Sequence, residues 1–383
     1  MNFTFTDEQQ ILRDSLRGFL RVHYPFDRRV AAIRSDSGWR RDFWIALAEQ
    51  VGVLGIGVPE ALGGVGGGAV ENMIVMEEFG RALVVEPYLE TVVLGAAALV
   101  AAGGAVAHQM LPGLVAGETI LAFAWAEETM RYNLQSIETL ARRDGAGWRI
   151  DGRKVVVTAA PWADQFLVAA RTGGSAGEAG GLSLFLVDKD APGLTLRRYP
   201  TVDGRQAADL DFKSVCVGSE ALLGEQGEAE PLIEALRDRA IAAIAAEAVG
   251  AMEQMLADTR DYVKGRDQFG QPLSSFQVLQ HRLVDMYMQI ELARSATYLA
   301  TLNLDSDARS RARTASSAKV SIAGACRYVG QNAVQLHGGM GMTDELPASH
   351  YFRRTTMIET EFGNADDHLA RHAQLSQQQS EFA

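Results

Sequence analysis

Three short stretches in the last third of the chain decide the fold: RDQFG at residues 266–270, FQVLQ at residues 276–280 and QLHGGMGM at residues 335–342. In the first stretch an arginine stands at the end of a segment with helical apolar spacing, and the second stretch begins the next such segment. Together they predict two helices joined by a turn. The third stretch has three glycines within four residues. Backbone amides there could approach a ligand as closely as a pyrophosphate requires.

Each stretch alone also has a purely structural interpretation. Arg266 could be the cation that closes a helix C-terminus, and His337 alone is better explained as a structural histidine than as a ligand or base. The glycine cluster lacks the strand and helix setting of a dinucleotide-binding fold and the lysine of a P-loop. Only the combination of the three stretches indicates a function.

Working outward from these stretches, the pattern of apolar residues changes twice. Helical spacing dominates up to about residue 117 and again after residue 230, whereas short apolar runs separated by Gly, Asp and Pro lie between them. This order predicts an α+β fold, mostly α, without internal repeats. The expected domains are a helical domain at residues 1–118, a middle antiparallel β domain at residues 119–224 and a C-terminal helical bundle at residues 225–383.

Composition restricts the class of protein. The 383 residues are 47% hydrophobic and 22% charged, as in an ordinary globular protein, and the net charge of −12 makes nucleic acid an unfavourable partner. Cys216 and Cys326 lie far apart without a CxxC pattern, which speaks against disulfides and metal sites and favours the cytoplasm. The N-terminus lacks the pattern of a signal peptide, and the most apolar stretch, residues 92–106, is too short to span a membrane.

Glu247 is unusual within a long apolar helical segment. Its neighbours three and four residues away are Ala243, Ile244, Gly250 and Ala251, none of which can pair with a carboxylate. One explanation is a partner from another helix or an edge that reaches water. The other is a general base whose pKa is raised by desolvation.

In this order after a β domain, RDQFG, FQVLQ and QLHGGMGM resemble the acyl-CoA dehydrogenase family. The similarity covers essentially the whole chain and implies the acyl-CoA dehydrogenase fold with FAD as cofactor. Within the family, the chain looks most like the small subunits of the pimeloyl-CoA dehydrogenase type and the two-subunit acyl-CoA dehydrogenases of steroid side-chain breakdown.

The resemblance implies FAD contacts at positions from two regions of the chain. Those in the C-terminal region match the family's contacts to the adenine and pyrophosphate, and those in the β domain match its contacts to the flavin ring. The implied residues are Trp125, Ala126, Thr158, Arg266, Phe269, Leu273, Phe276, Gln277, Gln335, Gly339 and Asn364.

The chain departs from the family pattern where the chemistry is expected. Ala126 replaces the usual flavin-contacting hydroxyl, and Val156 stands where a flavin-stacking Trp is common. The family's catalytic Glu aligns with Phe362, and its second known location aligns with Ala240. Either this subunit has no base, or the base has moved.

We favour a moved base. Glu247 lies seven residues after Ala240, about two helical turns, and therefore on the same face of the helix. Glu361 and Glu359 are close to the aligned position but need not face the same way, so they rank below Glu247 as candidates.

The resemblance implies an FAD-dependent α,β-dehydrogenation of an acyl-CoA thioester, as in fatty acid β-oxidation or steroid side-chain catabolism. It also implies an oligomer that passes electrons to an electron-transfer flavoprotein. Two alternatives remain at this stage: a non-catalytic subunit that shares FAD sites with a partner chain, and an acyl-CoA oxidase. The acyl chain cannot be identified from these residues.

Overall fold

The structure is a computed structural model that describes residues 4–377. Its contacts divide the chain into two compact units. One unit, here called the helical unit, contains residues 4–31, Ala69–Val84 and the chain from Ile241 onward. The other, the β unit, contains Ala32–Gly68 and Val85–Ala240. The domain boundaries at residues 118 and 224 remain predictions, because packing groups part of the N-terminal region with the C-terminal helices.

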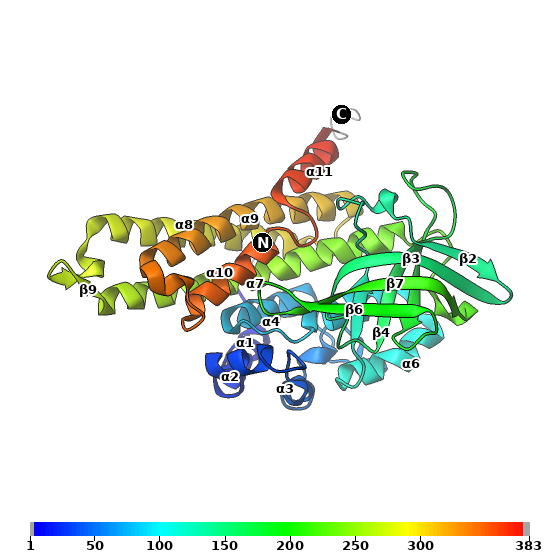
Figure 1. Cartoon of the computed structure of the whole chain (residues 1–383), viewed down its shortest axis with the longest axis horizontal. Coiled ribbons are helices and arrows are strands. Elements are labelled where there is room, and N and C mark those ends of the chain that lie inside the picture. The colour runs from blue at the N-terminus through cyan, green and yellow to red at the C-terminus, as the bar shows by residue number, and fades with distance from the viewer. Residues whose placement is uncertain (1–3, 378–383) are drawn as a thin grey trace. The chain divides into compact units, whose positions relative to one another are not determined.

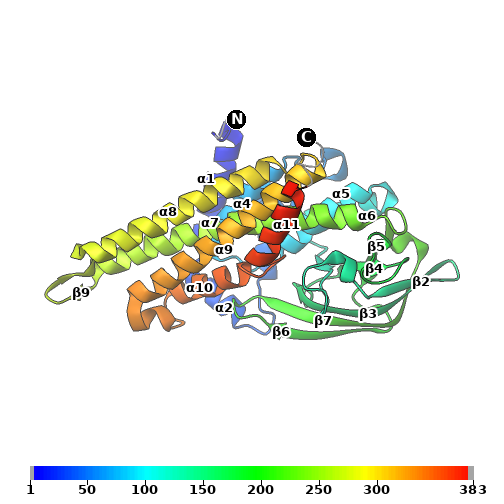
Figure 2. The ribbon, with the colours of Figure 1, turned by 90° about the horizontal axis from the view of Figure 1, so that it is seen from above.

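The helical unit is built around long helices that run side by side. Figures 1 and 2 show α7, α8 and α9 aligned along their lengths, with α11 crossing α9. The helices are α1 (Asp7–His23), the first part of α2 (Phe26–Ile33), α4 (Ala69–Ala82), the later part of α7 (Glu230–Gly265), α8 (Gln277–Leu302), α9 (Ala308–His337), α10 (Pro347–Ile358) and α11 (Ala365–Gln377), with a 3-10 helix η8 (Gly338–Met342).

Local sequence explains where these helices begin. The hydroxyl of Thr6 accepts from the amide of Gln9, and the side chain of Gln9 accepts from the amide of Thr6, which forms a capping box before α1. Asp307 caps α9 through its carboxylate. These side chains satisfy amides that the helices themselves cannot pair.

Helix α7 is apolar on almost every side and forms the core of the helical unit. It is long and apolar enough to cross a bilayer, but 78% of its apolar window is buried inside the protein. An all-round apolar helix that is buried to this extent is a core helix.

Two glycines bring α4 and α7 into backbone contact. A Cβ atom added to Gly80 would lie 1.9 Å from the carbonyl oxygen of Glu247, and one added to Gly250 would lie 1.8 Å from that of Glu77. No larger residue fits at either position without moving a helix. The crossing therefore fixes the place of Glu247 on the inner face of α7.

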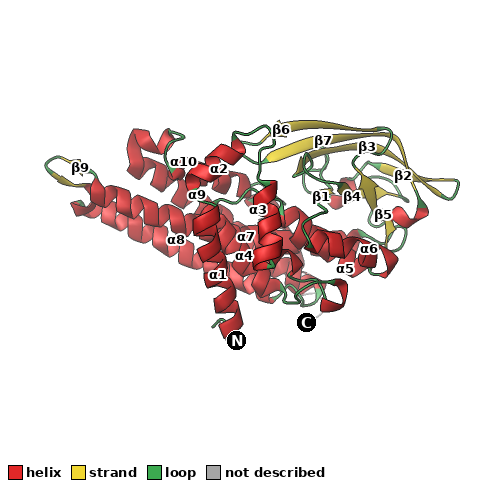
Figure 3. Ribbon diagram, turned by 90° about the horizontal axis from the view of Figure 1, so that it is seen from below, coloured by secondary structure: helices red, strands yellow, loops and turns green. Residues whose placement is uncertain are grey.

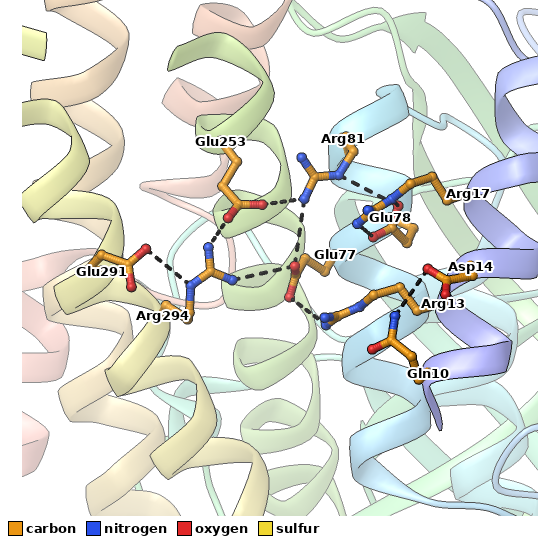
Figure 4. A network of polar contacts seen from close by, with 10 residues as sticks. All are labelled: Gln10, Arg13, Asp14, Arg17, Glu77, Glu78, Arg81, Glu253, Glu291 and Arg294. Atoms are coloured by element: carbon orange, nitrogen blue, oxygen red, sulfur yellow. Dashed lines mark hydrogen bonds and ion pairs between the residues drawn. The ribbon is translucent and has the colours of Figure 1, made fainter. Parts of the chain in front are cut away.

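A network of charged side chains links α1, α4, α7 and α8 (Figure 4). Glu77 lies between Arg13 and Arg294 at 3.5 Å from each, and Glu253 pairs with both Arg81 and Arg294. The Glu77 side chain is only 4% exposed. These groups border a cavity of about 670 Å³ whose other wall is apolar.

The β unit contains a single twisted sheet, coloured yellow in Figure 3, together with short helices. The strand order is β6-β7-β3-β2-β4-β5-β8, with β1 added to β4. The strands are β1 (Leu121–Ala124), β2 (Leu140–Asp144), β3 (Gly147–Thr158), β4 (Gln165–Arg171), β5 (Leu182–Asp188), β6 (Leu194–Pro200), β7 (Gln206–Val217) and β8 (Leu222–Leu223).

The helices of the β unit are short, and two of them have π-helical geometry. They are α3 (Arg41–Ala46), the π-helices η1 (Leu47–Val51) and η4 (Leu89–Ala96), α5 (Ala97–Ala102), α6 (Gly104–Val115), the 3-10 helices η2 (Val53–Gly55), η3 (Glu60–Leu62), η5 (Leu134–Ser136) and η6 (Ser219–Ala221), and the start of α7.

The predicted α+β class is confirmed, but the expectation of a purely antiparallel β domain is wrong. Strand β1 pairs in parallel with β4, and β2 meets β4 in parallel at one residue pair. The two apolar runs at residues 148–150 and 155–157 also belong to one strand, β3. Apolar runs indicate strands but not their pairing partners, so the sequence pattern could not show this.

Candidate active site

A cavity of about 610 Å³ in the helical unit brings together four of the residues predicted to bind FAD. Arg266 directly follows α7, Leu273 follows the two-stranded hairpin β9 (Asp267–Gln268) and β10 (Gln271–Pro272), and Gln335 and Gly339 lie at the junction of α9 with η8. The three sequence stretches thus meet in space around one cavity.

The residues of this cavity fit a dinucleotide diphosphate. Arg266 and Arg282 both line it and offer guanidinium donors, which match phosphate oxygens in geometry and charge. A Cβ atom added to Gly338 or Gly339 would meet nothing within 4 Å, so the backbone there is open to close approach.

Two aromatic rings lie beside the cavity. Phe269, at the tip of the β9–β10 hairpin, is 90% exposed and has a positive φ of 57°. Its ring meets that of Phe276 edge to face at 6.1 Å. The ring is therefore accessible to a partner that could cover it, such as an adenine or another chain.

Four predicted cofactor residues of the C-terminal region do not line the cavity: Phe269, described above, and Phe276, Gln277 and Asn364. Phe276 is the N-cap residue of α8, and Gln277 is its first residue. The side chain of Asn364 accepts from the amide of Asp367 at 2.9 Å, before α11. Asn364 therefore has a helix-capping role in this structure.

The sequence analysis missed two residues that line the cavity, Tyr262 and Arg282. Arg282 lies four residues after Val278, another lining residue, so helical spacing from FQVLQ could have found it. The ring of His337 stacks on Tyr262 at 4.4 Å, and its Nδ1 lies 2.8 Å from the carbonyl oxygen of Ala333. These contacts agree with the structural interpretation of His337.

The predicted flavin contacts of the β unit form a second group. Trp125 and Ala126 follow β1, and Thr158 is the last residue of β3. The amide of Val155 donates to the carbonyl of Ala126 at 2.9 Å, and Lys154 Nζ donates to the carbonyl of Trp125 at 3.2 Å. These bonds hold the segment after β1 against β3.

A buried ion pair strengthens this connection. Lys154 is fully buried, and its Nζ lies 2.7 Å from Oε1 of Glu127. The amides of Glu138 and Thr139 donate to the same carboxylate. Burial lowers the pKa of Lys154. Burial alone would raise the pKa of Glu127, but the charge of Lys154 and the hydrogen bonds from Lys154, Glu138 and Thr139 together lower it.

The environment of Glu247 corrects one premise of the sequence analysis. Glu247 is 1% exposed, but Arg354 of α10 holds both of its carboxylate oxygens at 2.7 Å. Of the two explanations for this isolated carboxylate, the structure shows a partner from another helix, so the carboxylate is not uncompensated. Arg354 also donates to Glu361 at 2.6 and 3.0 Å, so that one guanidinium joins two carboxylates.

The turn after α10 is held by further buried donors. Lys319 Nζ of α9 donates to the carbonyls of Ile358 and Glu361, and burial lowers its pKa to about 8. A ring nitrogen of His368 lies 3.0 Å from the carbonyl oxygen of Phe362, whose φ is +57°. The backbone at Phe362, which the resemblance aligns with the family's catalytic Glu, is thus fixed in a conformation that a non-glycine residue rarely adopts.

Within residues 4–377, no group of three or more His, Cys, Asp and Glu side chains could hold a metal ion. Both cysteines are free; Cys216 is exposed and Cys326 is buried. Burial raises the pKa of the Cys326 thiol to about 12. Cys326 is consequently an unreactive core residue.

Comparison with known proteins identifies the family. The acyl-CoA dehydrogenase N-terminal domain matches residues 6–118, the middle domain matches residues 122–215 and the C-terminal domain matches residues 236–374. The chain belongs to the acyl-CoA dehydrogenase family. It is an FAD-dependent oxidoreductase that acts in acyl-CoA dehydrogenation.

Relatives cover nearly the full length of the chain. The mitochondrial long-chain specific acyl-CoA dehydrogenase of Sus scrofa is 31% identical, over 91% of this chain and 81% of its own. A solved structure of the Tcur3481–Tcur3483 steroid acyl-CoA dehydrogenase is 32% identical, with a TM-score of 0.88 over 98% of this chain and 99% of the other. The ChsE4–ChsE5 complex from Mycobacterium tuberculosis is 27% identical, with a TM-score of 0.88 over 98% of each chain.

Proposed function

We propose that the chain catalyses the α,β-dehydrogenation of an acyl-CoA thioester to the 2-enoyl-CoA, with Glu247 as the general base. Bound FAD supplies the acceptor for the β-hydrogen, which leaves the substrate as hydride. The protein must then remove the α-proton, made acidic by the thioester, with a carboxylate that is ionised before the substrate arrives.

The observation that supports this proposal is the sharing of Arg354 by Glu247 and Glu361. The bidentate contact gives the buried carboxylate of Glu247 a counter-ion on both oxygens. When Glu247 accepts a proton, Arg354 can stay paired with Glu361, so no buried guanidinium loses its counter-ion.

Glu361 is the second candidate for the base. It precedes Phe362, the position that the resemblance implies for the base, and its side chain is 15% exposed against 2% for Glu247. Glu359, in contrast, pairs with Arg327 at 2.6 Å.

Three matched substitutions separate the candidates. Glu247→Gln should slow flavin reduction by acyl-CoA at least ~100-fold, the lower end of general-base contributions, whereas Glu359→Gln should have little effect. FAD content should stay unchanged in both. Loss of reduction in Glu361→Gln together with near-normal reduction in Glu247→Gln would transfer the role to Glu361.

We also propose that the chain works in an oligomer and passes its electrons to an electron-transfer flavoprotein. The related Tcur3481–Tcur3483 and ChsE4–ChsE5 structures are each named for two proteins, and the exposed Phe269 supports a covering partner here. A cytoplasmic location fits the two free cysteines. Mixing the purified chain with acyl-CoAs, with either an electron-transfer flavoprotein or oxygen as acceptor, tests these points together.

A non-catalytic, FAD-sharing subunit is the competing function. It is favoured by the bidentate Glu247–Arg354 pair, because such a pair can serve stability alone. If the purified chain binds FAD but no acyl-CoA in a panel of simple, dicarboxyl and steroid chains bleaches it until a second subunit is added, this function replaces ours.

A further inference from the structure

Strand β3 contains a β-bulge close to its end. Lys154 pairs with Leu210 of β7 and Val157 pairs with Ala208, so two residues of β3 oppose the single residue Asp209. A bulge of this kind bends the strand and redirects its amides.

The two bulged residues, Val155 and Val156, point their amides at different partners. Val155 donates to the carbonyl of Ala126, as described above. Val156 donates to Oδ1 of Asp209 at 3.3 Å and to the hydroxyl of Tyr199 at 3.2 Å. Val156 has a φ of +51° and a side chain that is 50% exposed. A β-branched residue adopts such a backbone only where its surroundings impose it.

Asp209 is the centre of those surroundings. Its side chain is 7% exposed and accepts from Arg153 at 2.9 Å and from Arg197 at 2.5 Å through Oδ2. The hydroxyl of Tyr199 donates to Oδ1 at 2.7 Å. Burial alone would raise the pKa of Asp209, but the bonds from Arg197, Tyr199 and Arg153 lower it well below its usual range. The carboxylate is thus a permanent anion with a fixed orientation.

We propose that Asp209 is a positioning residue for the flavin, which it serves by holding Val156 in its left-handed conformation. Val156 stands at the place of the family's flavin-stacking Trp, and Thr158 and Ala126 flank the same bulge. Without an aromatic side chain at this place, the shape of the backbone defines the surface that the flavin ring meets. The inference rests on the proposed flavin contacts of the β unit.

The test compares Asp209→Asn with Asp211→Asn in the FAD-loaded protein. Asp211 lies on the same strand, is 42% exposed and meets Arg153 at 3.7 Å, so its variant controls for loss of charge. Asp209→Asn should shift the visible absorption of bound FAD and weaken FAD binding about tenfold, the effect of one charge-assisted hydrogen bond. The amide of Val156 should exchange its hydrogen at least ~10-fold faster. Asp211→Asn should show none of these changes.

Val156→Gly distinguishes positioning from general stability. Glycine adopts a positive φ without strain, so Asp209→Asn should have a clearly smaller effect on FAD in the Val156→Gly protein. Equal effects in both backgrounds, or Asp209→Asn behaving like Asp211→Asn, would overturn the proposal. If Asp209→Asn does not fold, the same measurements are made on Tyr199→Phe. This variant removes the hydroxyl that donates to Asp209 and accepts from the amide of Val156.

These readouts do not depend on turnover. If the flavin is not reduced by any acyl-CoA but Asp209→Asn still shifts its spectrum and affinity, the dehydrogenase proposal fails and the positioning role stands. If acyl-CoA reduces the flavin normally but Asp209→Asn shifts neither its spectrum nor its affinity, the dehydrogenase proposal stands and the positioning role fails.

Discussion

The guanidinium of Arg354 binds both carboxylate oxygens of Glu247 across 107 residues of sequence. It also binds Glu361, so that a single cation on α10 ties α7 to the turn after α10. Substituting Arg354 therefore measures how much these contacts contribute to stability, whichever carboxylate takes the proton.

Arg354→Met should destabilise the protein by roughly 3–5 kcal/mol, because it leaves two carboxylates without their buried counter-ion. The matched variant Arg353→Met removes an arginine whose partner Asp344 is 57% exposed and should cost no more than about 1 kcal/mol. Denaturant unfolding of both variants measures the difference. Equal costs would show that the Arg354 contacts contribute little to stability.

Arg266→Ala should release FAD while leaving the secondary structure intact, because it removes a cationic donor from the cavity at the end of α7. Arg260→Ala is the control, since Arg260 is exposed and its nearest carboxylate, Asp261, is exposed as well. FAD content per chain and circular dichroism check both variants. Full FAD retention in Arg266→Ala would leave this arginine with only a helix-end role.

Glu77→Gln should become more stable relative to the wild type as the pH rises from acid to neutral. Burial raises the pKa of Glu77 despite the opposing charges of Arg13 and Arg294. Its contribution to stability is therefore complete below about 4.5, the ordinary value, and is lost as the pH rises through the folded-state pKa. The unfolding midpoint of Glu77→Gln relative to the wild type should rise from pH 4 to pH 7.

The control for Glu77 is Glu291→Gln, because Glu291 borders the same cavity but its side chain is 42% exposed. Its midpoint relative to the wild type should change little over this range. If the midpoint of Glu77→Gln relative to the wild type falls from pH 4 to pH 7, the ion pairs rather than desolvation determine the pKa of Glu77.

His350 should make the protein acid-sensitive. Arg29 can only donate, so Nδ1 of His350 accepts from it at 2.9 Å, and Nε2 donates to the carbonyl of Asp344 at 3.1 Å. Burial lowers the pKa of His350 to about 4, with Arg29 and Arg353 adding to the shift. Because the folded-state pKa is depressed, this contribution is present above pH 6.5 and is lost as the pH falls toward 4.

His350→Gln keeps an acceptor and a donor without the titration. Its unfolding free energy should therefore depend less steeply on pH between 6.5 and 4 than that of the wild type. His281→Gln, on the exposed face of α8, should leave the wild-type slope unchanged. An unchanged slope in His350→Gln would contradict the assignment.

The sequence stretches that line the cavity at the end of α7 could be singled out in advance for a physical reason, although their role in binding FAD stays a prediction. RDQFG and QLHGGMGM each lie at a helix end, where backbone groups and side chains are available to a ligand, and both lie on neighbouring helices of the helical unit. Arg282 was within reach of the same argument, because helical spacing places it next to Val278 on α8.

The partner of Glu247 could not be predicted in this way. Periodicity relates residues on one helix, whereas Arg354 approaches from α10, and no local pattern reports contacts between helices distant in sequence. The bulge at Val156 was hidden as well, since strand register depends on pairing with β7. What these elements share is dependence on tertiary packing.

The β9–β10 hairpin has a further consequence for how the protein can be studied. Lys264 and Arg266 are exposed beside Phe269, so a lone chain offers trypsin a short, strained and accessible segment. A cofactor or neighbouring chain that covers Phe269 would close the same segment to the protease. The rate of cleavage at this hairpin therefore reports directly how much of a preparation is in its assembled, loaded form.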